Sequence, residues 1–106
     1  MDELKLSKSL SQVDFVIETI RQIEKDFSRC NVKIRLENCQ NRDQLVQSIY
    51  DSINNLPVNK LQQLIYLIDI TEKEFLRIMS KPYCFQSLSE SILRREALKI
   101  YIRKNY

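Results

Sequence analysis

The chain has 106 residues, 43% of them hydrophobic, which suffices for one domain with a modest core. Charged residues make up 29% and the formal net charge is +3, so the composition is typical of a globular protein rather than of a disordered chain. The sequence contains no His and no Gly, and its three cysteines have no CxxC spacing.

These absences restrict the chemistry that the chain can perform. Without His it lacks the commonest general base and metal ligand, and Cys30, Cys39 and Cys84 alone cannot form a four-ligand zinc site. Without Gly it cannot form a P-loop, a dinucleotide fingerprint or a nucleophile elbow, each of which needs Gly at fixed positions. We therefore expect no enzyme activity, no cofactor and no metal.

The apolar runs and the N-terminal residues indicate where the protein resides. The longest run, LIYLI at 64–68, is far too short to cross a bilayer, and MDELKLSKSLSQ has no apolar core of a secretory signal. We expect a cytoplasmic protein without membrane contact, whose cysteines are small buried side chains rather than disulfides; a Cys30–Cys39 bridge is the minor alternative. Its wealth of Ile, Lys and Asn suggests an AT-rich genome, and QLIYLIDITEKEF and SILRREALKIYIRKNY look in a general way like pieces of a small bacterial helical protein.

The first long segment has the spacing of an amphipathic helix. Apolar residues three and four apart predict a single helix from near Ser7, or earlier, to about Ser28. The residues that share its apolar arc are Leu6, Leu10, Val13, Val16, Ile17, Ile20, Ile23 and Phe27. Phe15 lies outside this arc, so we expect it to be exposed, either without a role or as a contact point for a second chain.

Residues 31–37 alternate between apolar and charged side chains. Val32, Ile34 and Leu36 have the period of two that is typical of a strand, but nothing else in the chain offers a partner strand. We favour a short extended connector that inserts these three side chains into the core. The alternatives are a strand that pairs with its own copy in a dimer and a continued helix.

Three later helices are indicated by capping-box spacing, in which a polar N-cap is followed three residues on by Glu or Gln. The pairs are Asn41 with Gln44, Thr71 with Glu74, and Ser87 with Glu90. Pro57 fits the first turn of a fourth, VNKLQQLIYLIDI, which is apolar on nearly every side after Gln63. We expect that helix to be the central, most buried one; its β-branched content leaves a strand as the weaker alternative. The sequence thus predicts an all-α fold, a compact bundle of about five helices in a single domain over residues 1–106.

The closing segment SILRREALKIYIRKNY carries a stripe of cations, with Arg95, Lys99 and Arg103 four apart on one helix side. They could offset the negative end of the helix dipole. They could also neutralise the first helix, because residues 1–28 carry six acidic and four basic side chains whereas residues 57–106 carry five acidic and nine basic ones. Binding of a polyanion is the less favoured reading, because the net charge is low and no nucleic-acid motif accompanies the stripe.

Apolar residues occur on two sides of this closing helix, since Leu98 and Ile102 lie outside its main apolar arc. Together with Phe15 they are our candidate protein interface. Our leading hypothesis is a non-catalytic helical protein that acts through protein–protein interaction, as a homodimer or in a hetero-complex. The alternative is a nucleic-acid-binding or regulatory helical protein. Its candidate polyanion contacts are Arg94, Arg95, Lys99, Arg103 and Lys104.

Overall fold

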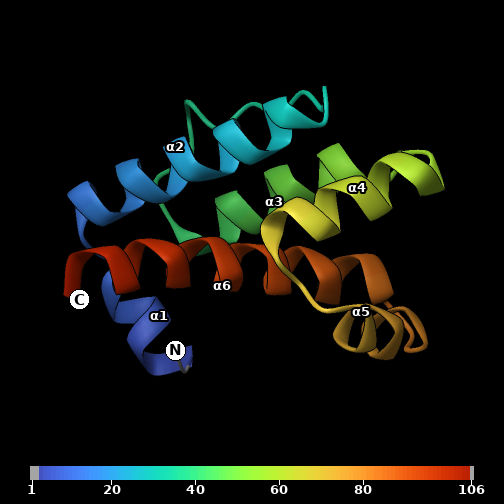
Figure 1. Ribbon diagram of the computed structural model, residues 1–106. Coiled ribbons are helices and arrows are strands. Elements are labelled where there is room, and N and C mark those ends of the chain that lie inside the picture. The colour runs from blue at the N-terminus through green and yellow to red at the C-terminus, as the bar shows by residue number, and fades with distance from the viewer. Residues whose placement is uncertain (1–2, 106) are drawn as a thin grey trace.

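Six helices make up the computed structural model, which describes residues 3–105 (Figure 1). They are α1 (Glu3–Ser9), α2 (Val13–Arg29), α3 (Arg42–Ile53), α4 (Val58–Ile68), α5 (Glu72–Met79) and α6 (Cys84–Asn105). No strand occurs within residues 3–105. The all-α prediction is therefore confirmed, with one helix more than the five expected.

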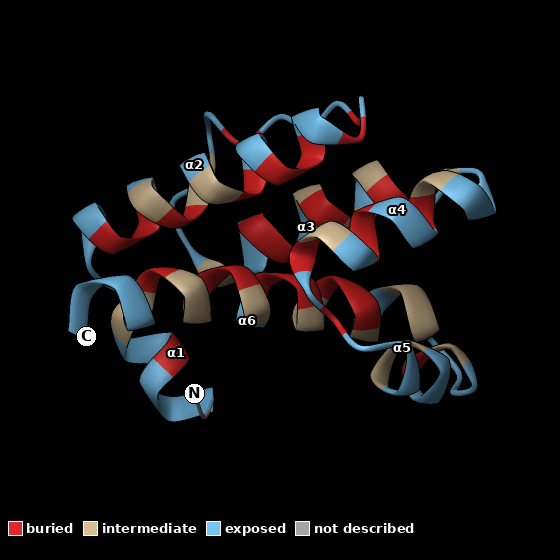
Figure 2. Ribbon diagram, in the orientation of Figure 1, coloured by how far each residue is buried: buried red, intermediate tan, exposed pale blue. Residues whose placement is uncertain are grey.

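The central element is α6, which packs against α2, α3, α4 and α5. A helix of its 22 residues is about 33 Å long, and the longest dimension of the molecule is 33 Å. The prediction that α4 is the central helix was wrong, because Val58 and Tyr66 of α4 are exposed. Figure 2 shows the buried residues on the sides of α2, α3 and α6 that face one another.

The single N-terminal helix that the spacing predicts is two helices, separated at residues 10–12. The Ser11 hydroxyl donates to the Lys8 carbonyl oxygen (2.5 Å), and the Gln12 N–H donates to that of Ser9 (3.0 Å). Such local hydrogen bonds offer the backbone an alternative to the helix. The apolar spacing continues across the break because Leu6 and Leu10 are buried in the same core as α2.

This break also changes which side of α2 is buried. Phe15 is only 4% exposed, whereas Val13 is 72% and Ile17 is 41% exposed. The expectation of an exposed Phe15 was therefore wrong. The spacing assigned one arc to a continuous helix, but the chain turns between α1 and α2, and α6 packs against α2. Phe15 and Tyr101 line the same hollow.

Residues 30–41 join α2 to α3 without a helix or strand, as expected of the connector that we favoured for residues 31–37. Val32 and Leu36 are buried and Ile34 is half-buried, so all three contribute to the core, as expected. The connector leads into α3, whose predicted start is confirmed because Asn41 Oδ1 accepts a hydrogen bond from the Gln44 N–H (3.0 Å).

The predicted start of α5 is confirmed and that of the closing helix is wrong. The Thr71 hydroxyl accepts from the Glu74 N–H (3.2 Å) at the first turn of α5. By contrast α6 begins at Cys84, and the Ser87 N–H donates to the Tyr83 carbonyl oxygen (3.1 Å) inside its first turn. A capping-box spacing therefore occurs at Ser87 without a cap.

Three described residues have the positive φ that glycine adopts most easily. Asn31 (φ 57°) follows α2, Asp69 (φ 73°) follows α4, and Tyr83 (φ 56°) precedes α6. Asn and Asp tolerate this left-handed region, but a Tyr there is uncommon. A chain without Gly thus turns at residues that carry a side chain.

All three cysteines are free thiols: Cys30 is buried, and Cys39 and Cys84 are half-buried. The alternative of a Cys30–Cys39 disulfide is therefore not borne out. Within residues 3–105, none of the helices has the length and apolar character needed to cross a membrane.

Candidate protein interface

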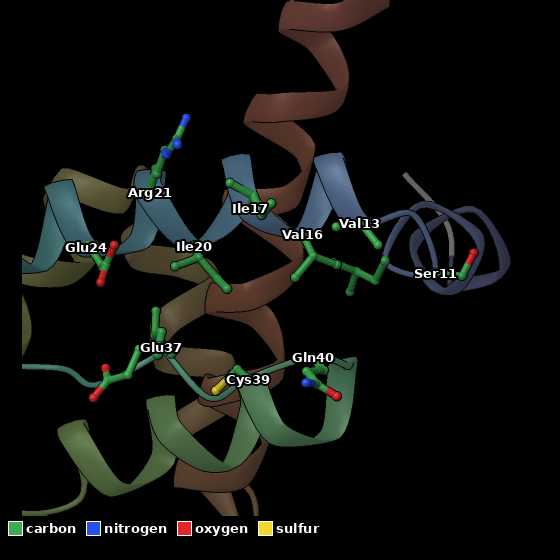
Figure 3. A pocket seen from close by; sticks show the side chains of 12 residues that line it. Ser11, Val13, Val16, Ile17, Ile20, Arg21, Glu24, Glu37, Cys39 and Gln40 are labelled. Carbon is green, nitrogen blue, oxygen red and sulfur yellow. The ribbon is translucent and has the colours of Figure 1, made fainter.

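A groove with a volume of about 650 Å³ lies between α2 and residues 36–40 of the connector (Figure 3). We call it the α2 groove. Its apolar wall is formed by Val13, Ile17 and Ile20 of α2, and Leu36 and Cys39 lie on the connector side. Leu36 is fully buried, so the groove opens directly onto the core.

Its apolar wall is an uncovered edge of the broad apolar face of α2. Val16 beside it is buried, Ile20 is half-buried, and Val13 and Ile17 are exposed. The sequence predicted that these side chains share one apolar arc of the helix. It did not indicate that part of this arc remains exposed to water. Large apolar side chains that remain in water beside a groove are typical of a binding surface.

Charged side chains border this groove. Figure 3 shows Glu24 directed from α2 towards Glu37 of the connector, and Arg21 directed away from it. Among the described residues, the side chains of Arg21, Glu24 and Glu37 take part in no ion pair or hydrogen bond. Apolar walls with unpaired charges at the rim are the arrangement expected of a protein-docking site.

A smaller groove of about 260 Å³ lies between α4 and α5. Tyr66 and Leu76 line it and are 83% and 60% exposed, and half-buried Phe75 lies with them. Among its described lining residues, Glu72 is the one charged side chain. This groove therefore has no rim with charges of both signs. We therefore regard the α2 groove as the better candidate.

The predicted interface residues are not brought together in either groove. Phe15 is buried and lines a separate hollow with Lys8 and Tyr101. Leu98 is half-buried and Ile102 is 46% exposed, both on α6. The apolar character of two sides of α6 is explained largely by its central position, because several helices surround it.

Each of the five candidate polyanion contacts has a partner inside the fold. The pairs are Arg94 with Glu3, Arg95 with Asp69 (2.7 Å), Lys99 with Asp26 (2.8 Å), Arg103 with Gln22 (2.9 Å) and Lys104 with Glu18 (2.9 Å). Three of these partners belong to α2. The expectation that an acidic first helix lies beside the basic closing helix is thus confirmed for α2 and α6.

A buried ionic cluster at the α2–α6 contact was not foreseen. Lys99 Nζ lies 2.8 Å from Asp26 Oδ2 and 2.8 Å from Glu96 Oε1. Asp26 is 2% exposed and Glu96 is fully buried, so two carboxyl groups share one ammonium away from water. A signal was present in the sequence, because Glu96 lies between Leu93, Ala97 and Ile100 on the apolar side of its helix.

The electrostatics of this cluster separate its two acids. Burial raises the pKa of Glu96 to about 8, so the group is mostly protonated at neutral pH. Burial opposes ionisation of Asp26 too, but hydrogen bonds from Lys99, Glu96 and Gln22 outweigh it and lower its pKa. Hydrogen bonds to the same two acids raise the pKa of Lys99 against the opposing effect of burial. The cluster is therefore close to neutral overall and joins the two helices.

The cluster joins α2 and α6 in the interior of the protein. Asp26, Glu96 and Lys99 line none of the grooves described above. Within residues 3–105, no group of three or more Cys, Asp or Glu side chains has an arrangement that could hold a metal ion. We conclude that the cluster is a structural element of the α2–α6 contact.

Comparison with known proteins gives no family for this chain. No family model matches its sequence, and no curated protein or solved structure matches it.

Proposed function

We propose that this chain is a non-catalytic binding protein that holds an amphipathic helix of another polypeptide chain in the α2 groove. The observation that carries this proposal is the exposure of Val13 and Ile17 (72% and 41%) along a groove with fully buried Leu36 at its base. Covering such side chains contributes about 25 cal/mol per Å² of apolar surface removed from water.

The spacing of the wall favours a helix as the bound element. Val13, Ile17 and Ile20 are four and three residues apart, which is the spacing by which one helix packs along another. Unpaired Arg21 and Glu24 at the rim offer both signs of charge to orient the bound helix.

Binding of a polyanion by the closing helix has less support. Each cation of that stripe already has an acidic or amide partner in the fold. A phosphate group would have to compete with these partners.

Site-specific photo-crosslinking tests the proposed function. A benzophenone amino acid replaces Ile17 in the groove wall or, as the matched control, Lys25 on the exposed side of α2. The labelled protein is irradiated both by itself and mixed with native cell extract. An adduct should form when the label is at position 17 and not when it is at position 25. Val13→Glu should abolish it, and the linked peptide should be an amphipathic helical segment. Equal labelling at positions 17 and 25, or an adduct that persists with Val13→Glu, would overturn the proposal.

A further inference from the structure

The exposed side of α2 has the apolar spacing of a coiled-coil seam. Val13, Ile17, Ile20 and Glu24 follow one another in steps of four, three and four residues, which is the alternation of d and a positions in a heptad repeat. Together they span about three helical turns. Three of the four are apolar, and Glu24 closes the seam at one end.

Two oppositely charged residues lie on the same flank of this seam. Asp14 directly follows Val13 and Arg21 directly follows Ile20, so both occupy the e position, seven residues apart. Both are exposed, and neither side chain forms an ion pair or hydrogen bond with another described residue. Charges at this position set the partner and the orientation of packed helices.

The position of these charges distinguishes the two ways in which a copy of α2 can pack against another. In a parallel pair, an e residue faces the g position of its neighbour, which here is Val16 or Ile23, and both are buried. In an antiparallel pair, e residues face each other. Asp14 then meets Arg21 of the second copy, and the symmetry repeats the contact at the other end.

We infer that the helix held in the α2 groove is α2 of a second copy of this chain, packed antiparallel and oriented by Asp14–Arg21 ion pairs. This inference rests on the proposed function and names its occupant. Ile17 of one copy lies opposite Ile20 of the other, and Glu24 lies opposite Val13 at the solvent-exposed end. A seam of three apolar positions per copy gives a reversible dimer with a Kd of roughly micromolar order.

Charge reversal tests the pairing by sedimentation equilibrium at about 50 mM salt. Asp14→Arg and Arg21→Glu each replace two attractive contacts with two repulsive ones, so each alone should weaken dimerisation by roughly tenfold. The double variant should regain the wild-type Kd within about threefold. An equimolar mixture of the two single variants should form a heterodimer, because each supplies the charge that the other lacks.

A matched control separates this pairing from net charge. Lys73→Glu makes the same charge change as Arg21→Glu, but on exposed α5, and should leave the Kd unchanged within about twofold. Circular dichroism shows whether each variant is folded. A double variant as weak as either single variant, or a mixture of the singles that stays monomeric, would overturn the inference.

The outcomes also separate this inference from the function on which it rests. A wild-type chain that stays monomeric at several hundred micromolar, yet gives a groove-dependent adduct at position 17 with another polypeptide, refutes only the pairing of two copies. A chain that stays monomeric and gives no such adduct refutes both. A dimer unaffected by Ile17→Glu would place the contact between copies elsewhere and refute the pairing, whereas the proposed function would still be decided by the adduct at position 17.

Discussion

Lys99 Nζ of α6 lies 2.8 Å from Asp26 Oδ2 of α2, although the two residues are 73 positions apart in the chain. Only 22% of the Lys99 side chain is exposed and only 3% of that of Asp26. A buried ion pair of this kind contributes little by itself, because removing both charges from water opposes their attraction. Removing only one partner of such a pair costs stability, because the other charge then stays buried without an opposite charge beside it.

Lys99→Met should therefore destabilise the protein by about 3–5 kcal/mol, because Asp26 keeps its charge in the interior. Lys104→Met is the matched control on the same helix. Its ion pair with Glu18 is exposed on both sides, so its loss should cost less than about 1 kcal/mol. Urea denaturation at pH 7 measures both variants. Equal losses of stability would contradict the buried character of the Asp26–Lys99 contact.

Glu96 should make the protein less stable as the pH rises from about 4.5 to about 8. Its pKa in the fold is raised to about 8 from an ordinary 4.5, so the folded state holds the proton longer than the unfolded state. The contribution of Glu96 to stability is therefore complete below its pKa in the unfolded state, and it is lost as the pH rises through its pKa in the folded state. The slope is at most about 1.4 kcal/mol per pH unit in this window.

Glu96→Gln should remove most of that slope, because an amide keeps the shape of the protonated carboxyl and does not titrate. Urea midpoints between pH 5 and pH 9 test this. The pKa of Asp26 is lowered and that of Lys99 raised, so their contributions fall in acid and alkaline windows outside this range. Glu90→Gln on the same helix is the control and should keep the wild-type slope. If Glu96→Gln and the wild type lose stability equally with pH, the titration of Glu96 is not the cause of the slope.

The sequence predicted the fold class because the relevant signals are local. Spacing of three and four residues and the caps at Asn41 and Thr71 depend on residues within one turn, and the structure contains both caps. The break at residues 10–12 was missed because Leu6 and Leu10 remain buried on the same side as the next helix. Periodicity reports burial, and it does not report whether the helix between two buried residues is continuous.

The candidate interface was harder to predict because it depends on which side chains the rest of the chain covers. Ile17 and Val16 are neighbours on one apolar arc, yet one is exposed and the other buried. Phe15 was expected to be exposed and is buried, again because other parts of the chain cover it. Lys99 was placed correctly on a stripe of cations, but its buried acid Asp26 comes from a distant helix, and no local pattern links them.

Tyr83 and Tyr66 should respond in opposite ways to replacement by Gly. Both are exposed, at 86% and 83%, so little packing is lost at either position. Tyr83 has φ 56°, a conformation that costs a residue with a Cβ atom about 1 kcal/mol, so Tyr83→Gly should stabilise the protein by up to that amount. Tyr66 lies inside α4, where Gly should cost roughly 0.5 kcal/mol. Thermal unfolding measures both, and destabilisation by Tyr83→Gly would contradict the strain.

Generic DNA and RNA should bind weakly, because the cations of α6 already have partners. Arg103 donates to Gln22 Oε1 and Lys104 pairs with Glu18, both on the adjacent α2. Phosphate contacts give binding that falls steeply with salt, so we expect no gel retention of a short duplex at about 50 mM salt. Retention that disappears at high salt, and with Arg103→Gln or Lys104→Gln but not with the control Lys73→Gln, would show that phosphate displaces these partners and would favour a nucleic-acid-binding role.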